Sequence, residues 1–421
     1  MKQKKLLFVT SRLPWPPNSG RKVSLYHYCR GLATKYGYEV SLFAFPEWDQ
    51  KKSANDKPDF ISEVRFAHPV SAFTKLKNLL CRTLVGKNRL PFQCALYYSK
   101  KNSRALSAFV EELSPDVIVF DMLRTAPYMA AQRKSGARIL LDLDDLLSVR
   151  YARQLEGFDG KTGIGGRYAG GMPRLLERLF CHGFLGKLIL RGEQKRAARA
   201  EIFYAKKADG VILVSEKEAT ALNGALGEGK AVAVPNGVDF AAFEAARTAK
   251  KEPNLIGFVG NLSVAANVAS LEYIAKEVLP KINTPCRLEV VGPCPADVRA
   301  RFADVERLTL RGEVPALPPV MGRWQLFLSP IAFGSGIKTK ILEAMAAALP
   351  VLTNAVGAEG IAADRGKDFV VLEDAAALAS VADRLLSDPV PAREMGEHAA
   401  AFIKKSFNWE TIFREFAKLE L

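Results

Sequence analysis

Residues 333–361, FGSGIKTKILEAMAAALPVLTNAVGAEGI, decide the fold, because a glycine-rich turn leads into a short helix and the helix is followed by a buried strand. Gly334 and Gly336 have no Cβ, so the backbone can bend sharply there and approach a ligand closely. A helix that begins near Ile337 or Lys338 directs unpaired N–H groups and the positive end of its dipole at such a ligand. The turn therefore predicts a phosphate site, although an ordinary helix cap fits the glycine spacing equally well.

Charged side chains of the same helix suit an anionic ligand that carries hydroxyl groups. Lys338 and Lys340 add positive charge beside the backbone amides. Glu343 follows one to two turns into the helix, where its carboxylate can accept hydrogen bonds from vicinal hydroxyls such as those of a ribose. Pro350 then ends the helix and Val351 begins a strand. The surrounding sequence has to decide between a phosphate site and a helix cap.

The rest of the chain consists of two series of alternating strand and helix patterns. The first series has strand candidates at KKLLFVTS, EVSLFAF, EVRFAH, DVIVF (116–120), RILLDL (138–143) and GVILVS (210–215). The second begins at LIGFVGNL and ends with residues 333–361. Such alternation predicts parallel sheets covered on both faces. The predicted fold class is α/β, with two tandem doubly wound, Rossmann-like domains that face each other across a cleft and bind ligands at their strand ends.

A turn and the polar segment after it mark the predicted boundary between the two domains. At AVAVPNGVDF (231–240) a strand ends in a Pro-Asn-Gly turn, and the polar segment FEAARTAKKEPN follows. We therefore expect a first domain over residues 1–236 and a second over 237–400. Residues 401–421 include FNWETIFREFAKLEL, which we expect to be one helix that packs its aromatic side chains on one of the domains.

Charge is distributed unevenly between the two halves of the chain. The 421 residues exceed what one hydrophobic core usually supports, and they carry 60 Lys and Arg against 45 Asp and Glu. Residues 1–240 contain 39 Lys and Arg and 23 Asp and Glu, whereas residues 241–421 contain 21 and 22. The whole excess belongs to the first half, which should therefore contact something anionic.

Two basic amphipathic segments suggest which anionic partner this is. Residues 71–101 and 172–199 interleave Lys and Arg with apolar side chains. Either could be an ordinary surface helix with solvated lysines, but two of them in one half favour peripheral contact with an anionic membrane. Nucleic acid is not expected, because stacking aromatics in a basic groove and nucleic-acid motifs are absent from the sequence.

Other sequence signals point to a cytoplasmic protein without a metal site. No apolar run approaches the roughly 20 residues of a spanning helix, and the first residues lead into a strand rather than a signal-peptide core. The six cysteines include no CxxC pair, and the four histidines form no HExxH motif. We expect buried free thiols, no zinc, and a location at or near the inner face of the cytoplasmic membrane.

The order and spacing of several motifs resemble those of the GT-B retaining glycosyltransferases of family 4. They are PNGVD at the domain junction, FVGNL at the start of the second domain, VVGP and LRGEV in its middle, and GSGIKTKILEAM followed by LPVLTNAVGAEGI. The resemblance runs over nearly the whole chain and is strongest from Val232 to Ile361. It implies that the C-terminal domain holds a sugar nucleotide, that the N-terminal domain receives the acceptor, and that a C-terminal helix crosses back to the first domain.

Carried over by position, the resemblance assigns donor binding to the glycine-rich turn and its helix. Glu343 corresponds to the second glutamate of the family's paired-glutamate motif, which binds the donor ribose. The first glutamate is replaced by Ser335, so contacts to the donor sugar and the detailed mechanism differ here. The diphosphate would be held at the turn and by the backbone amides after it, in Gly334, Gly336, Ile337, Lys338 and Thr339.

A second departure from the family lies in FVGNL. The family often has Arg or Lys after this strand and a Lys a few residues later, and both bind the diphosphate. Here Asn261 occupies the first position, and residues 261–275 contain no cation. Lys338 or Lys340 would then supply the charge that stabilises the departing diphosphate.

The first domain has candidate residues at two places. The loop PPNSGRK stands where the family has a glycine-rich loop near the donor phosphates and the acceptor, which makes Gly20 a candidate; Arg21 and Lys22 would help there or cap the next helix. In LLDLDDLLS, Asp144 falls on the histidine that many relatives carry beside an aspartate. We expect Asp142, Asp144 and Asp145 to bind acceptor or donor sugar, because carboxylates at one strand end are costly to keep without partners. Asp121 is a weaker candidate.

The reaction that the resemblance implies is transfer of a hexosyl unit from a UDP-sugar or GDP-sugar to a hydroxyl of a glycan or lipid-linked acceptor, with retention. The product would be an exopolysaccharide, lipopolysaccharide or related surface glycan. No cofactor or metal is required, although Asp142-Leu143-Asp144 also fits a metal-binding DxD motif. A nicotinamide oxidoreductase would need GxGxxG after the first strand, which is absent. The remaining alternative is a catalytically inactive, membrane-docking relative.

Overall fold

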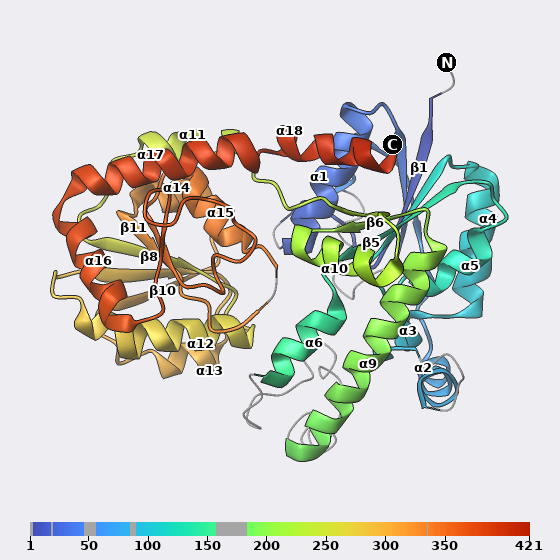
Figure 1. Ribbon diagram of the computed structural model, residues 1–421, viewed down its shortest axis with the longest axis horizontal. Coiled ribbons are helices and arrows are strands. Elements are labelled where there is room, and N and C mark those ends of the chain that lie inside the picture. The colour runs from blue at the N-terminus through green and yellow to red at the C-terminus, as the bar shows by residue number, and fades with distance from the viewer. Residues whose placement is uncertain (1–2, 18–19, 46–55, 85–89, 157–182, 335) are drawn as a thin grey trace. The chain divides into compact units, whose positions relative to one another are not determined.

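The computed structural model describes residues 3–17, 20–45, 56–84, 90–156, 183–334 and 336–421. The chain divides into two compact units (Figure 1). Unit 1 comprises Met1–Leu155, Phe184–Pro235 and Phe413–Leu421, and unit 2 is built on Asn236–Ile412. Each unit contains one parallel sheet, so the predicted α/β class with two doubly wound units is confirmed.

Unit 1 has a seven-stranded parallel sheet in the order β3-β2-β1-β4-β5-β6-β7. Its central strands are continuous apolar runs that are buried, as expected for strands covered on both faces. The strands are β1 (Lys5–Thr10), β2 (Glu39–Ala44), β3 (Ile61–Phe66), β4 (Val117–Asp121), β5 (Arg138–Asp144), β6 (Gly210–Leu213) and β7 (Ala231–Ala233). The helices are α1 (Gly20–Thr34), α2 (Ala72–Asn78), α3 (Phe92–Tyr97), α4 (Lys100–Leu113), α5 (Met129–Gln132), α6 (Leu147–Glu156), α9 (Gly183–Lys207) and α10 (Glu216–Leu226).

Unit 2 has a six-stranded parallel sheet in the order β10-β9-β8-β11-β12-β13. The strands are β8 (Leu255–Val259), β9 (Arg287–Val291), β10 (Leu308–Gly312), β11 (Leu326–Leu328), β12 (Val351–Thr353) and β13 (Val370–Val371). The main helices are α11 (Glu244–Thr248), α12 (Ala265–Tyr273), α13 (Ala296–Arg301), α14 (Leu317–Arg323), α15 (Thr339–Ala346), α16 (Ala375–Ser387) and α17 (Pro389–Ser406). Helix α12 continues as a π-helical turn, Ile274–Val278, and a 3₁₀ turn, Leu279–Lys281.

A buried tryptophan organises the core of unit 2 on one face of its sheet. Trp324 is fully buried, and its indole N–H donates to Glu289 Oε2 at 2.7 Å. A Cβ on Gly257 would lie 2.0 Å from this indole ring, so β8 must carry glycine where the tryptophan packs. The polar end of the ring is therefore satisfied while its apolar body fills the core.

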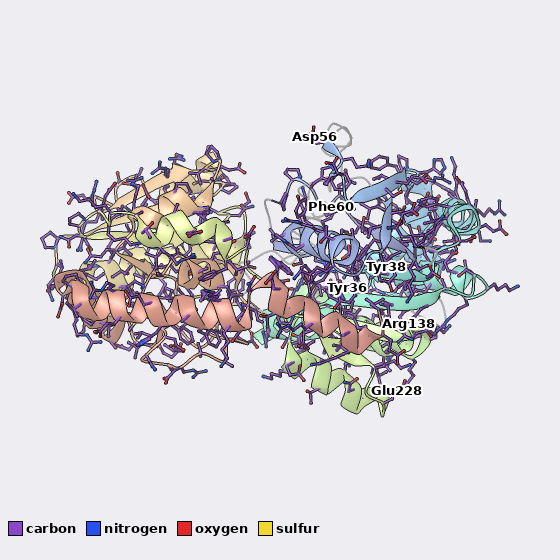
Figure 2. The ribbon with its side chains drawn as sticks, turned by 90° about the horizontal axis from the view of Figure 1, so that it is seen from above. Tyr36, Tyr38, Asp56, Phe60, Arg138 and Glu228 are labelled. Atoms are coloured by element: carbon purple, nitrogen blue, oxygen red, sulfur yellow. The ribbon has the colours of Figure 1, made fainter. Side chains whose placement is uncertain are left out.

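The C-terminal segment is not the one helix that we expected over 401–421. Residues to Ser406 belong to α17, whose C-cap Phe407 leaves the helical region, and α18 (Trp409–Ile412) and a 3₁₀ helix (Phe413–Leu419) follow. The last residues are part of unit 1: the Tyr36 hydroxyl donates to the Phe413 carbonyl, and Arg138 pairs with Glu420 at 2.8 Å (Figure 2). These contacts attach the end of the chain to the first unit.

Part of the two basic segments lies within the described residues. Residues 71–84 form α2 and a π-helical extension, Leu79–Leu84, and residues 90–101 contain α3 and the start of α4. Residues 172–182 lie outside the described residues, and α9 covers the remainder of the second segment. None of the helices in the described part of the chain combines the length and apolar character needed to cross a bilayer.

Candidate functional site

The glycine-rich turn of unit 2 follows β11 and precedes α15. Gly334 and Gly336 adopt φ values of 149° and 69°, which L residues with a Cβ rarely adopt. Helix α15 begins at Thr339, and its N-cap, Lys338, makes no side-chain cap hydrogen bond. The first amides of α15 therefore have no cap from that side chain, as a phosphate site at a helix N-terminus requires. Ser335 lies outside the described residues.

Lys338 folds back over the turn that it follows. Its ammonium donates to the Gly336 carbonyl and lies 3.9 Å from Glu359 Oε2. The segment that carries Glu359 is held against the turn, since a Cβ on Gly360 (φ 77°) would lie 2.7 Å from Ile337. Lys338 therefore helps to shape the turn and keeps its positive charge beside it.

Lys340 connects the turn to the start of the domain, although the two are far apart in sequence. Its ammonium donates to Asn267 Oδ1 at 3.0 Å, and Asn267 Nδ2 donates to the Asn261 carbonyl at 2.9 Å. The ammonium also lies 4.6 Å from the centroid of the Phe258 ring. Burial, and then the charge of Lys338, lowers the pKa of Lys340 to about 7. A ligand phosphate near this ammonium would favour its protonated form.

Glu343 lies one turn beyond Lys340 on α15. Burial raises the pKa of its carboxyl group to about 7. Among the described residues, no hydrogen bond or ion pair to this carboxylate is found. A half-buried carboxyl group without a cation is destabilised when ionised, and hydroxyl groups of a ligand could satisfy it. Glu343 and Lys340 are thus two side chains behind the glycine-rich turn whose pKa values both lie near 7.

Close backbone contacts place Asn261 at the carboxyl end of the unit 2 sheet. Gly260 and Gly292 follow β8 and β9, and a Cβ on Gly292 would lie 2.3 Å from the Gly260 carbonyl oxygen. Gly260 N donates to Val291 O at 2.9 Å, and Asn261 Oδ1 accepts from Ser263 N at 2.9 Å. Carboxyl ends of parallel strands are where doubly wound sheets bind ligands. Asn261 therefore lies at the expected edge, and Asn267 connects it to Lys340.

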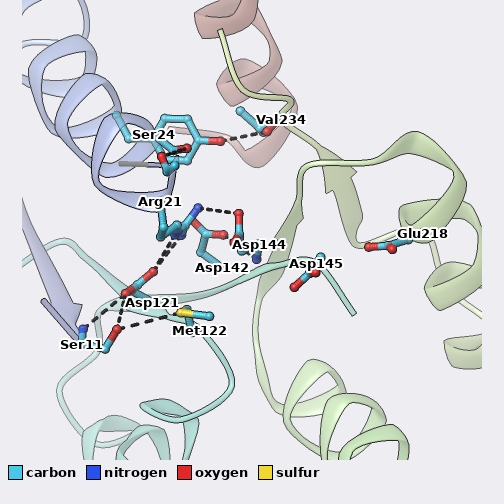
Figure 3. A network of polar contacts seen from close by, with 12 residues as sticks. Ser11, Arg21, Ser24, Asp121, Met122, Asp142, Asp144, Asp145, Glu218 and Val234 are labelled. Carbon is cyan, nitrogen blue, oxygen red and sulfur yellow. Dashed lines mark hydrogen bonds and ion pairs between the residues drawn. The ribbon is translucent and has the colours of Figure 1, made fainter. Parts of the chain in front are cut away.

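Unit 1 contains a different cluster at the carboxyl ends of its central strands (Figure 3). Arg21, on α1, forms ion pairs with Asp121 at 2.8 Å, with Asp142, and with Asp144 at 3.3 Å. Asp121 and Asp142 are fully buried, whereas the Asp144 side chain keeps 18% of its surface exposed. Ser11 contributes its hydroxyl, which donates to Asp121 Oδ2 at 3.2 Å. One guanidinium thus holds carboxylates from β4 and β5 together.

The carboxylates of this cluster outnumber its cation. Burial, opposed by Arg21 and reinforced by the neighbouring aspartates, raises the pKa of Asp142 to about 6. Burial likewise raises the pKa of Asp144, again opposed by Arg21. Asp144 has φ 66°, a left-handed conformation that Asp tolerates better than most residues, and its amide donates to Asp142 Oδ1 at 3.1 Å. Asp144 is therefore the partly exposed member of the cluster.

The expectations for the first domain are changed in two respects. Arg21 serves neither a phosphate nor the start of α1, because its guanidinium is used by the three aspartates. Asp145 leaves the cluster and forms a two-point ion pair with Arg150, with Arg150 Nε donating at 2.8 Å. Gly20 is the first residue of α1 and is exposed, and a Cβ added to it would have no neighbour within 4 Å. Glycine is thus not required there by packing.

Sequence reasoning missed the residue that joins the predicted site residues of unit 2. The sequence pattern places Asn267 only within a helix, but its side chain bridges Lys340 and Asn261. Its position in the first turn of the first helix after β8 was the available signal. Gly334, Gly336, Ile337, Lys338, Thr339, Lys340, Glu343 and Asn261 all belong to unit 2, and Gly20 and Asp144 belong to unit 1. Within the described ranges, no group of three or more His, Cys, Asp or Glu side chains is arranged to hold a metal ion.

Comparison with protein families places the unit 2 site in a known class. Residues 253–388 match the family described as Glycosyl transferases group 1. This region is therefore similar to glycosyl transferases group 1 domains. It includes Asn261, Asn267, the glycine-rich turn and α15. A curated relative, an uncharacterized 44.6 kDa protein in the cps region of Klebsiella pneumoniae, is 22% identical over 172 residues. The match covers 38% of this chain and 44% of that relative, less than half its length.

Solved structures share the fold over the whole chain. The Anabaena protein Alr3699/HepE in complex with UDP has a TM-score of 0.66 and 15% identity, with 99% of both chains covered. Sucrose-phosphate synthase from Thermosynechococcus elongatus has a TM-score of 0.66, 17% identity, and coverage of 99% of this chain and 98% of that one. A mutant of TarM from S. aureus, solved with fondaparinux, alpha-GlcNAc-glycerol and UDP, has a TM-score of 0.65, 12% identity and 99% coverage of both chains. The fold is therefore GT-B.

Proposed function

We propose that this protein is a retaining glycosyltransferase that moves a hexosyl unit from a UDP-sugar or GDP-sugar to a hydroxyl of a glycan or lipid-linked acceptor. The observation that carries the proposal is the pair Lys340 and Glu343. Both side chains are half-buried on one helix behind a glycine-rich turn, in the region that matches the group 1 family, and desolvation brings both pKa values to about 7. Perturbed pKa values of this kind are typical of functional sites.

In the proposed reaction, the turn and the start of α15 hold the diphosphate. Amides of Gly336 to Thr339 donate to its oxygens, and Lys340 and Lys338 neutralise the charge that develops as the bond to the sugar breaks. Glu343 accepts hydrogen bonds from the ribose hydroxyls. The leaving phosphate accepts the proton of the acceptor hydroxyl, so no cofactor and no metal ion has a role in the proposal.

Asp144 is the proposed contribution of unit 1 to substrate binding. It is the exposed member of the Arg21 cluster, and its backbone conformation and Arg21 hold its carboxylate in place. A carboxylate at a strand end can accept hydrogen bonds from sugar hydroxyls. We assign it to the acceptor or the donor sugar.

The proposed pathway is the synthesis of a surface polysaccharide such as an exopolysaccharide or lipopolysaccharide. Support comes from the partial match to the cps-region protein of Klebsiella pneumoniae. We place the protein in the cytoplasm, at the inner face of the membrane where lipid-linked acceptors are available. The positive charge excess of residues 1–240 supports contact with anionic lipid.

A thermal-shift screen against UDP, GDP and ADP sugars, followed by hydrolysis of the sugars that bind, tests the proposal. The wild-type protein should be stabilised by UDP or GDP sugars, and Glu343→Ala should lose most of that stabilisation. Glu397→Ala, which changes an exposed glutamate of α17, is the matched control and should behave as wild type. If no nucleotide sugar binds the wild-type protein, the proposal is wrong. Binding without hydrolysis or transfer would instead support the inactive, membrane-docking alternative.

A further inference from the structure

Helix α2 and its continuation Leu79–Leu84 turn apolar side chains toward the solvent. Phe73, Leu76 and Leu80 are 76%, 57% and 50% exposed, and their spacing of three and four residues puts them on one helix face. We call these three side chains the α2 stripe. Large apolar side chains are usually buried, and several on one exposed face indicate an interaction surface.

The opposite face of the same helix attaches it to unit 1 through polar groups. Asn78 is 8% exposed, and its amide donates to the carbonyls of Ala95 at 2.9 Å and Tyr98 at 2.7 Å. The Arg82 guanidinium lies 4.1 Å from the centroid of the Tyr98 ring. This arrangement is the reverse of an ordinary amphipathic surface helix, which buries its apolar face. Turning the helix to bury the α2 stripe would break both amide hydrogen bonds.

The charge around the α2 stripe identifies the chemistry of its partner. Residues 64–110 contain nine Lys and Arg and no Asp or Glu. Lys75 and Lys77 are exposed on α2 itself. Apolar side chains bordered by lysines suit the interface of an anionic bilayer, where the apolar groups enter the acyl boundary and the ammonium groups stay among the phosphates.

Helix α2 follows the same end of the unit 1 sheet at which the Arg21 cluster lies. Helices α2 and α3 are inserted between the end of β3 at Phe66 and the start of α4 at Lys100. The insertion therefore follows the carboxyl end of a strand, and in Figure 1 α2 lies at the end of unit 1 toward which β1 runs. Asp121 and Asp144 lie at the carboxyl ends of β4 and β5 in the same sheet.

We propose that the α2 stripe, together with Lys75 and Lys77, docks unit 1 on an anionic lipid surface. The stripe enters the interface, and the two ammonium groups bind lipid phosphates. Docking in this way would bring the acceptor edge of unit 1 close to a lipid-linked acceptor. That last consequence rests on the proposed transferase activity, and the docking assigns the proposed contact with anionic lipid to named residues.

Flotation of the full chain with vesicles tests the proposal. One set of vesicles contains equal parts of phosphatidylglycerol and phosphatidylcholine, and the other contains phosphatidylcholine alone. We expect binding to the anionic vesicles that weakens as salt rises. Phe73→Ser/Leu76→Ser/Leu80→Ser should lower the partition coefficient by about tenfold or more, and Lys75→Gln/Lys77→Gln should lower it about tenfold at low salt and reduce its salt dependence.

Val390→Ser provides a matched control, because Val390 is 51% exposed but belongs to α17 of unit 2. It should bind vesicles as the wild type does. Thermal unfolding of every variant, with and without the nucleotide sugar found for the wild type, shows that the fold and the donor site are intact. Loss of donor binding with vesicle binding retained would count against the proposed function and not against docking.

Three results would overturn the docking proposal. The wild-type chain could remain unbound to anionic vesicles at low salt, or the triple serine variant could bind them as tightly as the wild type. Size-exclusion chromatography could also show that the wild type self-associates without binding vesicles and that the triple serine variant does not self-associate. The last result would assign the α2 stripe to a second copy of the chain instead of to lipid.

The exposed thiol of Cys81, next to Leu80, offers a local readout. In a Cys181→Ser/Cys294→Ser background, an environment-sensitive fluorophore on Cys81 should shift to shorter wavelength with anionic vesicles. The same vesicles should cause no shift when the three serine substitutions are added. An unshifted label on a chain that floats with the vesicles would place the lipid contact elsewhere.

Discussion

The two units keep ionisable side chains at the same kind of sheet edge, but they treat the charge in opposite ways. In unit 1, Arg21 binds three aspartates, so the cluster contains a cation of its own, although one cation serves three carboxylates. In unit 2, Lys340 bonds to the neutral amide of Asn267, and no described cation pairs with Glu343. Burial therefore brings both pKa values to about 7. The Arg21 guanidinium holds the unit 1 carboxylates in place, whereas Lys340 and Glu343, which have no described partner of opposite charge, favour a ligand that supplies the missing charge or hydrogen bonds.

The largest effect is expected where a counter-charge is removed from unit 1. Arg21→Met leaves Asp121 and Asp142 buried without a cation, which should lower the free energy of unfolding by about 3–5 kcal/mol. Urea denaturation measures this. Arg150→Met is the comparison, because Arg150 is 37% exposed and pairs with a single aspartate, so its loss should cost less than the loss of Arg21. Equal losses for the two variants would contradict the contrast between a cation that serves three carboxylates and a cation that serves one.

The next largest effect is expected when the positive charge of Lys340 is removed from unit 2. Lys340→Met removes a cation from the proposed diphosphate site and should weaken binding of UDP-glucose or GDP-mannose, whichever the wild type prefers, by about 10- to 100-fold. The free energy of unfolding should stay the same or rise near pH 7, because a buried cation is replaced by an apolar side chain of similar shape. Isothermal titration calorimetry and urea denaturation measure the two quantities. A large loss of stability with unchanged binding would show that Lys340 is structural.

The number of protons taken up or released when the ligand binds distinguishes the role of Lys340 from that of Glu343. The pKa of Lys340 is about 7, so at pH 8 it is mostly neutral when free and should gain up to about one proton when a diphosphate binds. The pKa of Glu343 is also about 7, so at pH 6 it is mostly protonated and should release a proton when ribose hydroxyls bind its carboxylate. Calorimetry in buffers of different ionisation enthalpy measures both. Lys340→Met should abolish the uptake at pH 8 and leave the release at pH 6.

The smallest change in stability is expected at Asp144, the exposed member of the unit 1 cluster. Asp144→Asn keeps a residue that tolerates φ 66° and removes one of three like charges, so the free energy of unfolding should change by less than about 1 kcal/mol. If Asp144 binds a sugar, the transfer rate should still fall by about tenfold or more. Asp142→Asn, by contrast, breaks a fully buried ion pair. Unchanged transfer by Asp144→Asn would remove unit 1 from the proposed site.

Much of the fold could be predicted from the sequence because its signals are local. Alternating strand and helix patterns predicted two parallel sheets, and the strands at 138–143 and 210–215 were predicted to within two residues of their ends. The C-terminal segment was predicted as one helix, but it breaks after Ser406, since packing of Phe413 and Phe416 in unit 1 decides its path. Helical periodicity alone cannot show where a chain leaves one core and enters another.

The sequence by itself determined the chemistry at the turn: glycines that allow its backbone, lysines beside them, and a glutamate one turn later. These features are local, and spacing along one helix is enough to bring them together. Only the tertiary structure decided how charge is balanced. Arg21 meets aspartates 100 or more residues away, and Lys340 reaches Asn267, which is 73 residues away in the sequence and contacts Asn261. Burial depends on those distant contacts, and burial is what sets the pKa values that distinguish the two units.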